Sequence, residues 1–251
     1  MHLLAIFTIF NGVIAHTKIY KVVNSVDCLF PNQIGQNPME AAEKLEKIDM
    51  QCGSGAKPAR KQCKVNAGSE IILKYDVDTS HNQAEGPIIA KSHVGPCNAY
   101  LAPSGGAGSK APTEGWFKIY QGIWDPQNKW CTDKLRNDDG ILKIPIPSGI
   151  KAGNYILRSE VTSVHKPEAQ FYVQCLDLAI SSNGTALPLS KETVSIPGYL
   201  SMKSPGVKFN AYSKFGGSKY PSLGPSVWKS PATTNPRNKT SRYRCRRKNS
   251  K

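Results

Sequence analysis

The chain of 251 residues carries a formal net charge of +15, is 39% hydrophobic and contains 18 prolines and 21 glycines. Its apolar side chains suffice for a real core, but they occur in many short runs separated by Pro and Gly. This pattern is typical of a loop-rich β protein and disfavours a helical one. Beyond the N-terminus, no run is long and apolar enough to anchor the chain in a membrane.

The N-terminus has the composition of a secretory signal peptide. Residues 3–14 form an apolar run that is too short to span a bilayer, and the small residues Val13 and Ala15 suit a cleavage site. We therefore expect residues 1–15 to be removed, the protein to be secreted into the extracellular medium, and the mature chain to begin with His16.

A histidine at a free N-terminus can chelate a metal by itself. His16 would offer its α-amine and its ring Nδ1, and a second histidine would complete three nitrogens in a roughly planar arrangement that suits Cu(II). The alternative is that the cleavage site lies elsewhere and that His16 is an ordinary strand residue.

The apolar pattern predicts the elements in chain order. An early strand covers 16–23, and a helix is expected at about 38–48, with Asn37 as N-cap and Glu40 three residues later. Strand-like runs punctuated by Gly and Pro follow at 70–77, 97–102, 116–122, 141–146, 154–161 and 169–180. Short strands with one helix predict an all-β fold, an antiparallel β-sandwich with long loops.

His93 lies in a predicted turn, residues 92–96 with the sequence Ser-His-Val-Gly-Pro. Gly and Pro favour a fixed turn before the next strand, which could hold the imidazole at a surface. The alternative is a histidine that is merely solvated, as most turn histidines are.

His165 precedes the strand that begins with Gln170, Phe171 and Tyr172. Strand alternation places Gln170 and Tyr172 on one face and points Phe171 the other way, into the core. If His165 folds over the first face, that surface carries an imidazole, an amide and a phenol. The alternative is an ordinary amphipathic strand.

The C-terminal tail, residues 229–251, is basic. From Ser230 onward it holds eight Lys or Arg residues and no acidic one. Because it lacks apolar periodicity, we expect a disordered arm that binds anionic polymers. Nucleic acid is not the expected partner, since an exported protein leaves the compartments that hold nucleic acid. Basic tracts also do not by themselves indicate a particular anionic partner.

Cysteine usage and glycosylation motifs agree with export. Asn183 and Asn238 each begin an Asn-x-Thr acceptor. Seven cysteines fit an oxidising compartment as disulfides with one left over, for which Cys245 in the tail is expected. Spacing does not give the connectivity of the others, which are Cys28, Cys52, Cys63, Cys97, Cys131 and Cys175.

Several motifs in a fixed order resemble one known family. The chain resembles the fungal lytic polysaccharide monooxygenases of auxiliary-activity family nine, formerly a glycoside hydrolase family, over roughly residues 16–228, the expected catalytic domain. The matching positions are His16, 92–96, 115–119, 153–160, His165 with 170–172 and Cys175, 195–198, 204–207 and 220–228.

The resemblance implies an immunoglobulin-like β-sandwich with a flat face that binds one copper ion. His16 and His93 would be the metal ligands and Tyr172 the axial neighbour. Gln170 and His165 would form the second sphere and help to set protonation at the site. The implied disulfide pairs are Cys52 with Cys175 and Cys97 with Cys131.

The implied activity is oxidative cleavage of glycosidic bonds in cellulose or related β-glucans. It would use copper, an external electron donor, and oxygen or hydrogen peroxide, and a monomer would act on the insoluble polysaccharide. Paired carboxylates for hydrolysis are neither required nor recognisable. The alternative is a secreted copper-binding or wall-binding protein of the same fold without oxidative activity.

Substrate-binding aromatics are sparse compared with the family pattern. Residues 76–86 lack the Trp and extra histidines of many relatives, and the loop at 30–46 lacks the usual tyrosines. By position, Tyr212 and Tyr220 are the candidates for stacking on the substrate. Ordinary loop packing is the alternative for both.

Overall fold

The computed structural model describes residues 17–25, 27–31, 39–40, 45–77, 87–127 and 129–231. The predicted signal peptide, His16, Asn238, Cys245 and the predicted tail beyond residue 231 lie outside the described residues.

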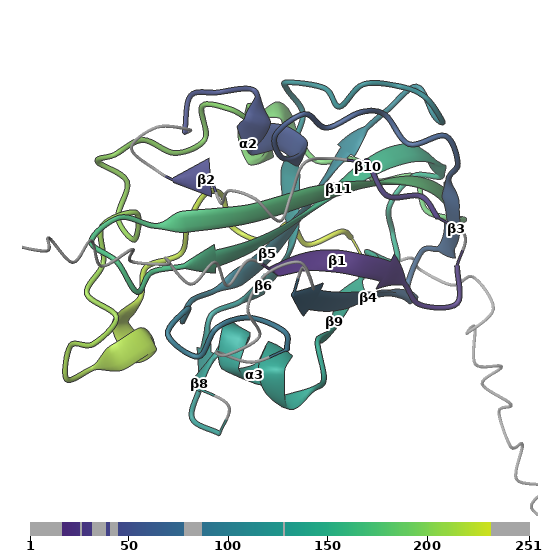
Figure 1. Ribbon diagram of the computed structural model, residues 1–251. Helices are drawn as coiled ribbons and strands as arrows, with labels where there is room; N and C mark the ends of the chain where they lie inside the picture. The colour runs from purple at the N-terminus through teal and green to yellow at the C-terminus, as the bar shows by residue number, and fades with distance from the viewer. Residues whose placement is uncertain are drawn as a thin grey trace, which may run out of the picture.

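Two sheets form the body of the molecule (Figure 1). The smaller sheet has the order β1 (Thr17–Val22), β4 (Glu70–Val77), β9 (Ile141–Pro145). The larger sheet has the order β2 (Met39–Glu40), β11 (Gln170–Ser181), β10 (Gly153–Ser163), β5 (Cys97–Pro103), β6 (Phe117–Gly122). A further strand, β3 (Cys63–Asn66), pairs with β11 in parallel, so the sandwich is not purely antiparallel. A short hairpin joins β7 (Trp124–Asp125) to β8 (Lys129–Trp130).

The larger sheet is buried on both faces. One face packs against the smaller sheet, through residues such as Leu157, Val161 and Leu176. The other carries a second core, with Ile156 and Phe171, beneath the loops that follow β11. Burial on both sides explains why 169–180 is almost continuously apolar in sequence.

The seven predicted strands are confirmed to within a few residues as β1, β4, β5, β6, β9, β10 and β11, whereas the short strands β2, β3, β7 and β8 were not predicted. The helix predicted at 38–48 is wrong for 39–40 and 45–48, the residues of this span that the structure describes. Met39 and Glu40 pair instead with Phe171 and Gln170 as an edge strand, and the short helix α2 (Asp49–Cys52) begins only after the predicted helix ends. Pairing with a buried strand has overridden the local capping signal.

A second helix, α3 (Cys131–Asn137), was not predicted. It starts at a cysteine, and its N-terminal support comes from Asp133, whose carboxylate accepts a hydrogen bond from the Trp130 amide at 3.0 Å. Two 3₁₀ turns, Ser190–Glu192 and Gly216–Lys219, lie in the C-terminal loops.

Three disulfides join the elements. Cys52 is bonded to Cys175 and Cys97 to Cys131, the two pairs that the resemblance implies. The third bond joins Cys28 to Cys63, which spacing had left open. Of the seven cysteines, Cys245 is the one outside these pairs. In the described part of the chain, no helix combines the length and apolarity that a membrane crossing needs.

A buried ion pair lies on the outer face of β10. Arg158 Nη1 donates to Glu160 Oε2 at 2.6 Å, and both side chains are fully buried. Burial acts to raise the pKa of Glu160, but the charge of Arg158 and hydrogen bonds from Tyr199, Arg158 and Asn98 outweigh it and hold the pKa below its ordinary value. Arg158 also donates to the carbonyls of Met50 and Gln51, so the pair anchors α2 on the sheet.

Candidate metal centre

The turn that carries His93 is docked on the end of β10. Thr162 N donates to Pro96 O at 2.9 Å, and Val164 N donates to Val94 O at 2.8 Å. Gly95 makes this approach possible, because a Cβ at that position would overlap the carbonyl oxygen of Thr162. The turn therefore places His93 beside the residues that follow β10.

Three rings meet at this point. The His93 and His165 rings are stacked, with centroids 4.1 Å apart and planes 28° apart. The centroid of Tyr172 lies 6.1 Å from that of His93. The structure thus brings together two histidines that are 72 positions apart in the sequence. Beside them lies Tyr172, which strand alternation predicted to share a face with Gln170.

Hydrogen bonds fix both imidazoles through Nδ1. Ser163 Oγ lies 2.6 Å from Nδ1 of His165, and Ser92 Oγ lies 3.1 Å from Nδ1 of His93. With Nδ1 of His93 engaged by Ser92, Nε2 is the ring nitrogen that we expect to point toward a metal. Ser163 was missed in the sequence, although its spacing of two from His165 is compatible with such a contact.

Strand β11 alternates as predicted. Tyr172 packs with the core between the two sheets, whereas Phe171 packs with the core on the opposite face. Gln170 and Tyr172 are nevertheless nearly buried, with exposed fractions of 3% and 4%. Gln170 pairs with Ser163 on one side and Glu40 on the other, and Tyr172 belongs to the core between the two sheets.

Strand β1 leads toward the same end of the sandwich. Ile19 N donates to Gln174 Oε1 at 2.9 Å, which ties β1 to the face of β11 that also carries Tyr172. The two strands run in the same sense (Figure 1), so β1 begins near the end of β11 that holds Gln170. His16 directly precedes Thr17, the first residue of β1, and lies outside the described residues.

The side chains of the described residues would suit copper only together with a further ligand from a residue outside the described part of the chain. The described residues hold no group of three His, Cys, Asp or Glu side chains that could bind a metal by itself. What the described residues supply is two imidazole rings, His93 and His165, which lie against each other. Imidazole with an added amine is a donor set that Cu(II) favours.

The two candidate platform tyrosines differ in exposure. Tyr212 is 67% exposed, and its hydroxyl donates to Ser92 O at 3.3 Å, which puts it beside the His93 turn. Tyr220 is only 7% exposed, donates to Gly206 O and packs against Trp130, with ring centroids 5.4 Å apart. Its proposed role in stacking on substrate is therefore corrected to loop packing.

Comparison with known proteins identifies the family. The sequence model of Auxiliary Activity family 9, formerly GH61, matches residues 7–220. The chain belongs to Auxiliary Activity family 9. The match spans β1, both histidine positions and β11, so the ring cluster lies within the part of the chain that defines family 9.

Individual relatives agree in sequence and fold. The chain is 36% identical over 213 residues to the AA9 family lytic polysaccharide monooxygenase C of Aspergillus tamarii, covering 81% of this chain and 56% of that protein. Among solved structures, CvAA9A is similar with a TM-score of 0.72 at 24% identity, over 85% of this chain and 98% of that one. HiLPMO9B gives 0.65 at 29% identity, over 80% and 87%. The chain spans about half the length of the first curated family 9 relatives.

Asn183, the first predicted glycosylation acceptor, is exposed in the loop after β11. This exposure is compatible with modification, which stays a prediction. The second acceptor, Asn238, lies outside the described residues.

Proposed function

We propose that this protein is a secreted, copper-dependent lytic polysaccharide monooxygenase that oxidatively cleaves glycosidic bonds in cellulose or a related β-glucan. The observation that carries the proposal is the stacking of His93 on His165 beside Tyr172, at the end of the sandwich where β1 begins. Membership of family 9 supports the same reaction.

His16 and His93 would hold the ion. His16 would give its α-amine and Nδ1, and His93 would give Nε2. Bound copper would supply one-electron chemistry between Cu(I) and Cu(II), with an external donor as reductant and oxygen or hydrogen peroxide as oxidant. Cleavage of the signal peptide before His16 is required, because an additional residue would block the amine.

The surrounding side chains would control access and protonation. Tyr172 fills the protein side of the site and, at 4% exposure, keeps bulk water from it. Ser163 holds the His165 imidazole through Nδ1, so that the other ring nitrogen can serve as a proton donor or acceptor toward the open side. The nearly buried amide of Gln170 would add a hydrogen-bonding group of fixed orientation.

Tyr212 would contact the polysaccharide. Its ring is exposed and tethered to the His93 turn, so a sugar that stacks on it would lie close to the metal. A surface position suits an insoluble substrate, because a crystalline chain cannot thread into a deep pocket.

The decisive experiment is oxidation of phosphoric-acid-swollen cellulose by the copper-loaded protein with ascorbate, followed by mass spectrometry of the soluble products. We expect oxidised oligosaccharides from the protein that begins at His16. We expect none from His93→Ala or from a protein that carries one extra N-terminal residue, and both should bind copper at least roughly a hundredfold more weakly. Unchanged copper affinity in both variants would refute the ligand assignment. Tight copper binding without any product would instead indicate a copper-binding protein that lacks the oxidative activity.

A further inference from the structure

Strand β1 exposes two consecutive side chains. The register with β4 shifts between Ile19 and Lys21, which marks a β-bulge at Tyr20. As a result Tyr20 and Lys21 are both exposed, although neighbouring residues of a regular strand face opposite sides. Tyr20 is 63% exposed, an unusual position for a large ring on a strand. Bulges often redirect a side chain toward a ligand.

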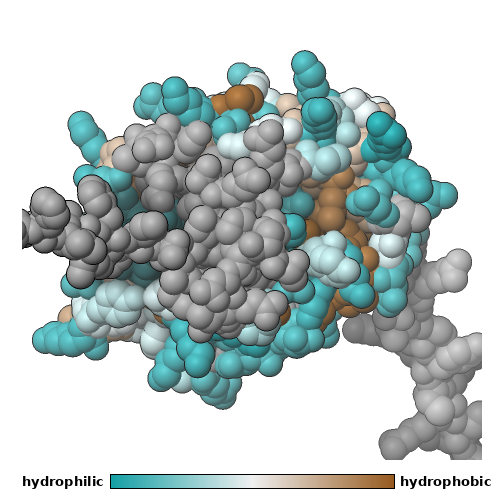
Figure 2. All heavy atoms as spheres, viewed as in Figure 1, coloured by the Kyte–Doolittle hydropathy of each residue, from teal (hydrophilic) through white to brown (hydrophobic). Residues whose placement is uncertain are grey.

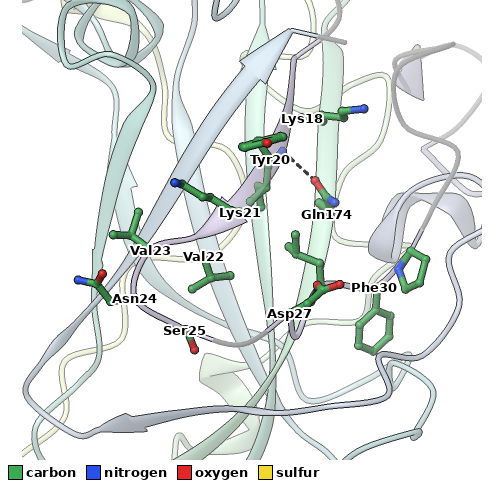
Figure 3. A pocket seen from close by; sticks show the side chains of 13 residues that line it. Lys18, Tyr20, Lys21, Val22, Val23, Asn24, Ser25, Asp27, Phe30 and Gln174 are labelled. Atoms are coloured by element: carbon green, nitrogen blue, oxygen red, sulfur yellow. Dashed lines mark hydrogen bonds between the residues drawn. The ribbon is translucent and has the colours of Figure 1, made fainter. Parts of the chain in front are cut away.

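The redirected side chains border a groove on the surface of the described molecule. The groove encloses about 980 Å³, a size typical of ligand sites, and lies between β1 and the segment 27–31 (Figure 3). Its floor is apolar through Val22, Leu29 and Phe30. In Figure 2, a strip of hydrophobic atoms lies between hydrophilic ones over the region of β1 and β11.

Polar groups of both signs line the rim of the groove. Lys21, Asn24, Ser25 and Asp27 are all exposed there. The Asp27 carboxylate accepts a hydrogen bond from Leu29 N at 3.2 Å, which fixes its position. Ammonium, amide, hydroxyl and carboxylate groups together supply both donors and acceptors.

This composition favours a neutral polyhydroxylated ligand. An acidic saccharide would meet the Asp27 carboxylate, and a basic peptide would meet Lys18 and Lys21. Added strand pairing is also disfavoured, because the Ile19 amide already donates to Gln174. An exposed phenol ring beside an apolar floor offers a flat surface for the apolar face of a sugar ring.

We propose that the groove along β1 binds a neutral β-glucan chain, with Tyr20 stacked on one sugar and Lys21, Asn24 and Asp27 bonding to its hydroxyls. The saccharide class rests on the proposed function. Tyr20 lies three residues from Thr17, roughly 10 Å along the strand. The groove therefore begins close to the expected copper position and could hold a part of the substrate beyond the cleavage site.

The test uses copper-free protein and cellohexaose, so that binding is measured apart from oxidation. We expect saturable shifts of the Lys21, Asn24 and Ser25 amides in NMR titrations. Tyr20→Ala should weaken this binding about tenfold, in line with the loss of one aromatic stacking contact. Its thermal midpoint should stay unchanged because the ring is mostly exposed. Leu189→Ala, which truncates another exposed apolar side chain (60%), should bind like the unmodified protein.

Three results would overturn the groove assignment. They are shifts confined to the surroundings of Tyr212, unchanged binding in Tyr20→Ala, or stronger binding of an oligogalacturonate than of cellohexaose at the same residues. Failure of the proposed function looks different. In that case cellohexaose would still bind to the β1 groove, but the copper-loaded protein would release no oxidised product.

Discussion

At the scale of single residues, the site depends on how the His165 ring is held. Its Nδ1 lies 2.6 Å from Ser163 Oγ, and its face packs on His93. The hydroxyl of Ser163 thus sets the orientation of a ring that is proposed to handle protons. Ser163 would therefore affect the reaction only indirectly, by orienting the imidazole of His165.

Ser163→Ala should therefore lower turnover more than stability. Losing one hydrogen bond is expected to cost about 1 kcal/mol in unfolding free energy, whereas rotation of the freed imidazole should reduce turnover on cellulose roughly tenfold or more. The matched control is Ser159→Ala on the same strand. It removes the buried bond to Tyr75, 2.7 Å long, and should cost similar stability without affecting turnover. Equal turnover in the two variants would argue against a positioning role for Ser163.

For the tyrosines, the sequence predicts which face of a strand a side chain occupies, but it does not predict how deeply the side chain is buried. Alternation along β11 predicted that Tyr172 and Phe171 face opposite ways, and they do. The degree of burial was not predictable, because it depends on neighbours from other elements, such as His93, whose ring centroid lies 6.1 Å from that of Tyr172. Likewise, the exposure of Tyr212 and the burial of Tyr220 depend on contacts made in the folded chain. Tyr220 packs against Phe209 and against Trp130, which lies 90 positions earlier in the sequence, whereas Tyr212 is 67% exposed.

At the scale of elements, the His93 turn is positioned by contact between backbones. Gly95→Ala should displace residues 92–96 from β10, since the added Cβ would overlap Thr162 O. We expect copper affinity to fall by roughly tenfold or more and stability by about 2 kcal/mol. Gly108→Ala is the control. It is strained by a φ of +82° but has no atom within 4 Å of the added Cβ, so it should lose stability only. Copper affinity, measured by isothermal titration, decides between local displacement and a general loss of stability.

The buried Arg158–Glu160 ion pair also connects β10 to α2, because Arg158 donates to the carbonyls of Met50 and Gln51. Glu160→Gln leaves the guanidinium buried without its counter-charge and should destabilise the fold by about 3 kcal/mol at pH 7. The pKa of Glu160 is lowered in the folded state, so its contribution is fully present above the ordinary carboxyl pKa and is lost as the pH falls through the lowered value. Urea unfolding between pH 7 and pH 3 should therefore show a weaker acid dependence in the variant. The control, Glu70→Gln at an exposed site, should leave the free energy of unfolding at pH 7 nearly unchanged.

The predicted helices and strands are correct where the local sequence pattern determines the structure. They are wrong where a partner far away in the sequence determines it. The β10 and β11 runs were long and apolar enough to be identified directly. The helix at 38–48 had a plausible cap and stripe, yet Met39 and Glu40 found partners in Phe171 and Gln170. Helix α3 was not predicted because its N-cap residue is Trp130 and not one of the usual capping residues. Its first residue, Cys131, is held by a disulfide to Cys97.

At the scale of the whole molecule, the chain leaves the described domain far from the ring cluster. Ser230 Oγ accepts a hydrogen bond from Gly149 N, just before β10 begins, whereas Ser163 ends that strand roughly 33 Å away. Trp228 also packs on Phe117, with ring centroids 5.2 Å apart. Residues up to 231 therefore belong to the folded domain.

Removal of residues 232–251 should leave the site intact and weaken only electrostatic adsorption. The segment carries eight basic residues. We expect unchanged copper affinity and unchanged oxidation of soluble oligosaccharide. Adsorption to an anionic polymer such as polygalacturonate should fall at low salt, and the difference should vanish at high salt because exposed charges are screened. A truncated protein that loses copper would contradict this, as would one that adsorbs equally at low salt.

The double burial of the larger sheet also determines which parts of the molecule open last. Amide hydrogens in the middle of β10 and β11 can exchange with deuterated solvent only when two separate cores loosen, whereas the loops around 182–231 can exchange by local opening. His165 follows the end of β10 after one residue, Val164, and Tyr172 lies within β11. We therefore expect the ring cluster to be attached to the slowest-exchanging cooperative unit of the described chain and to remain assembled while the surrounding loops already fluctuate.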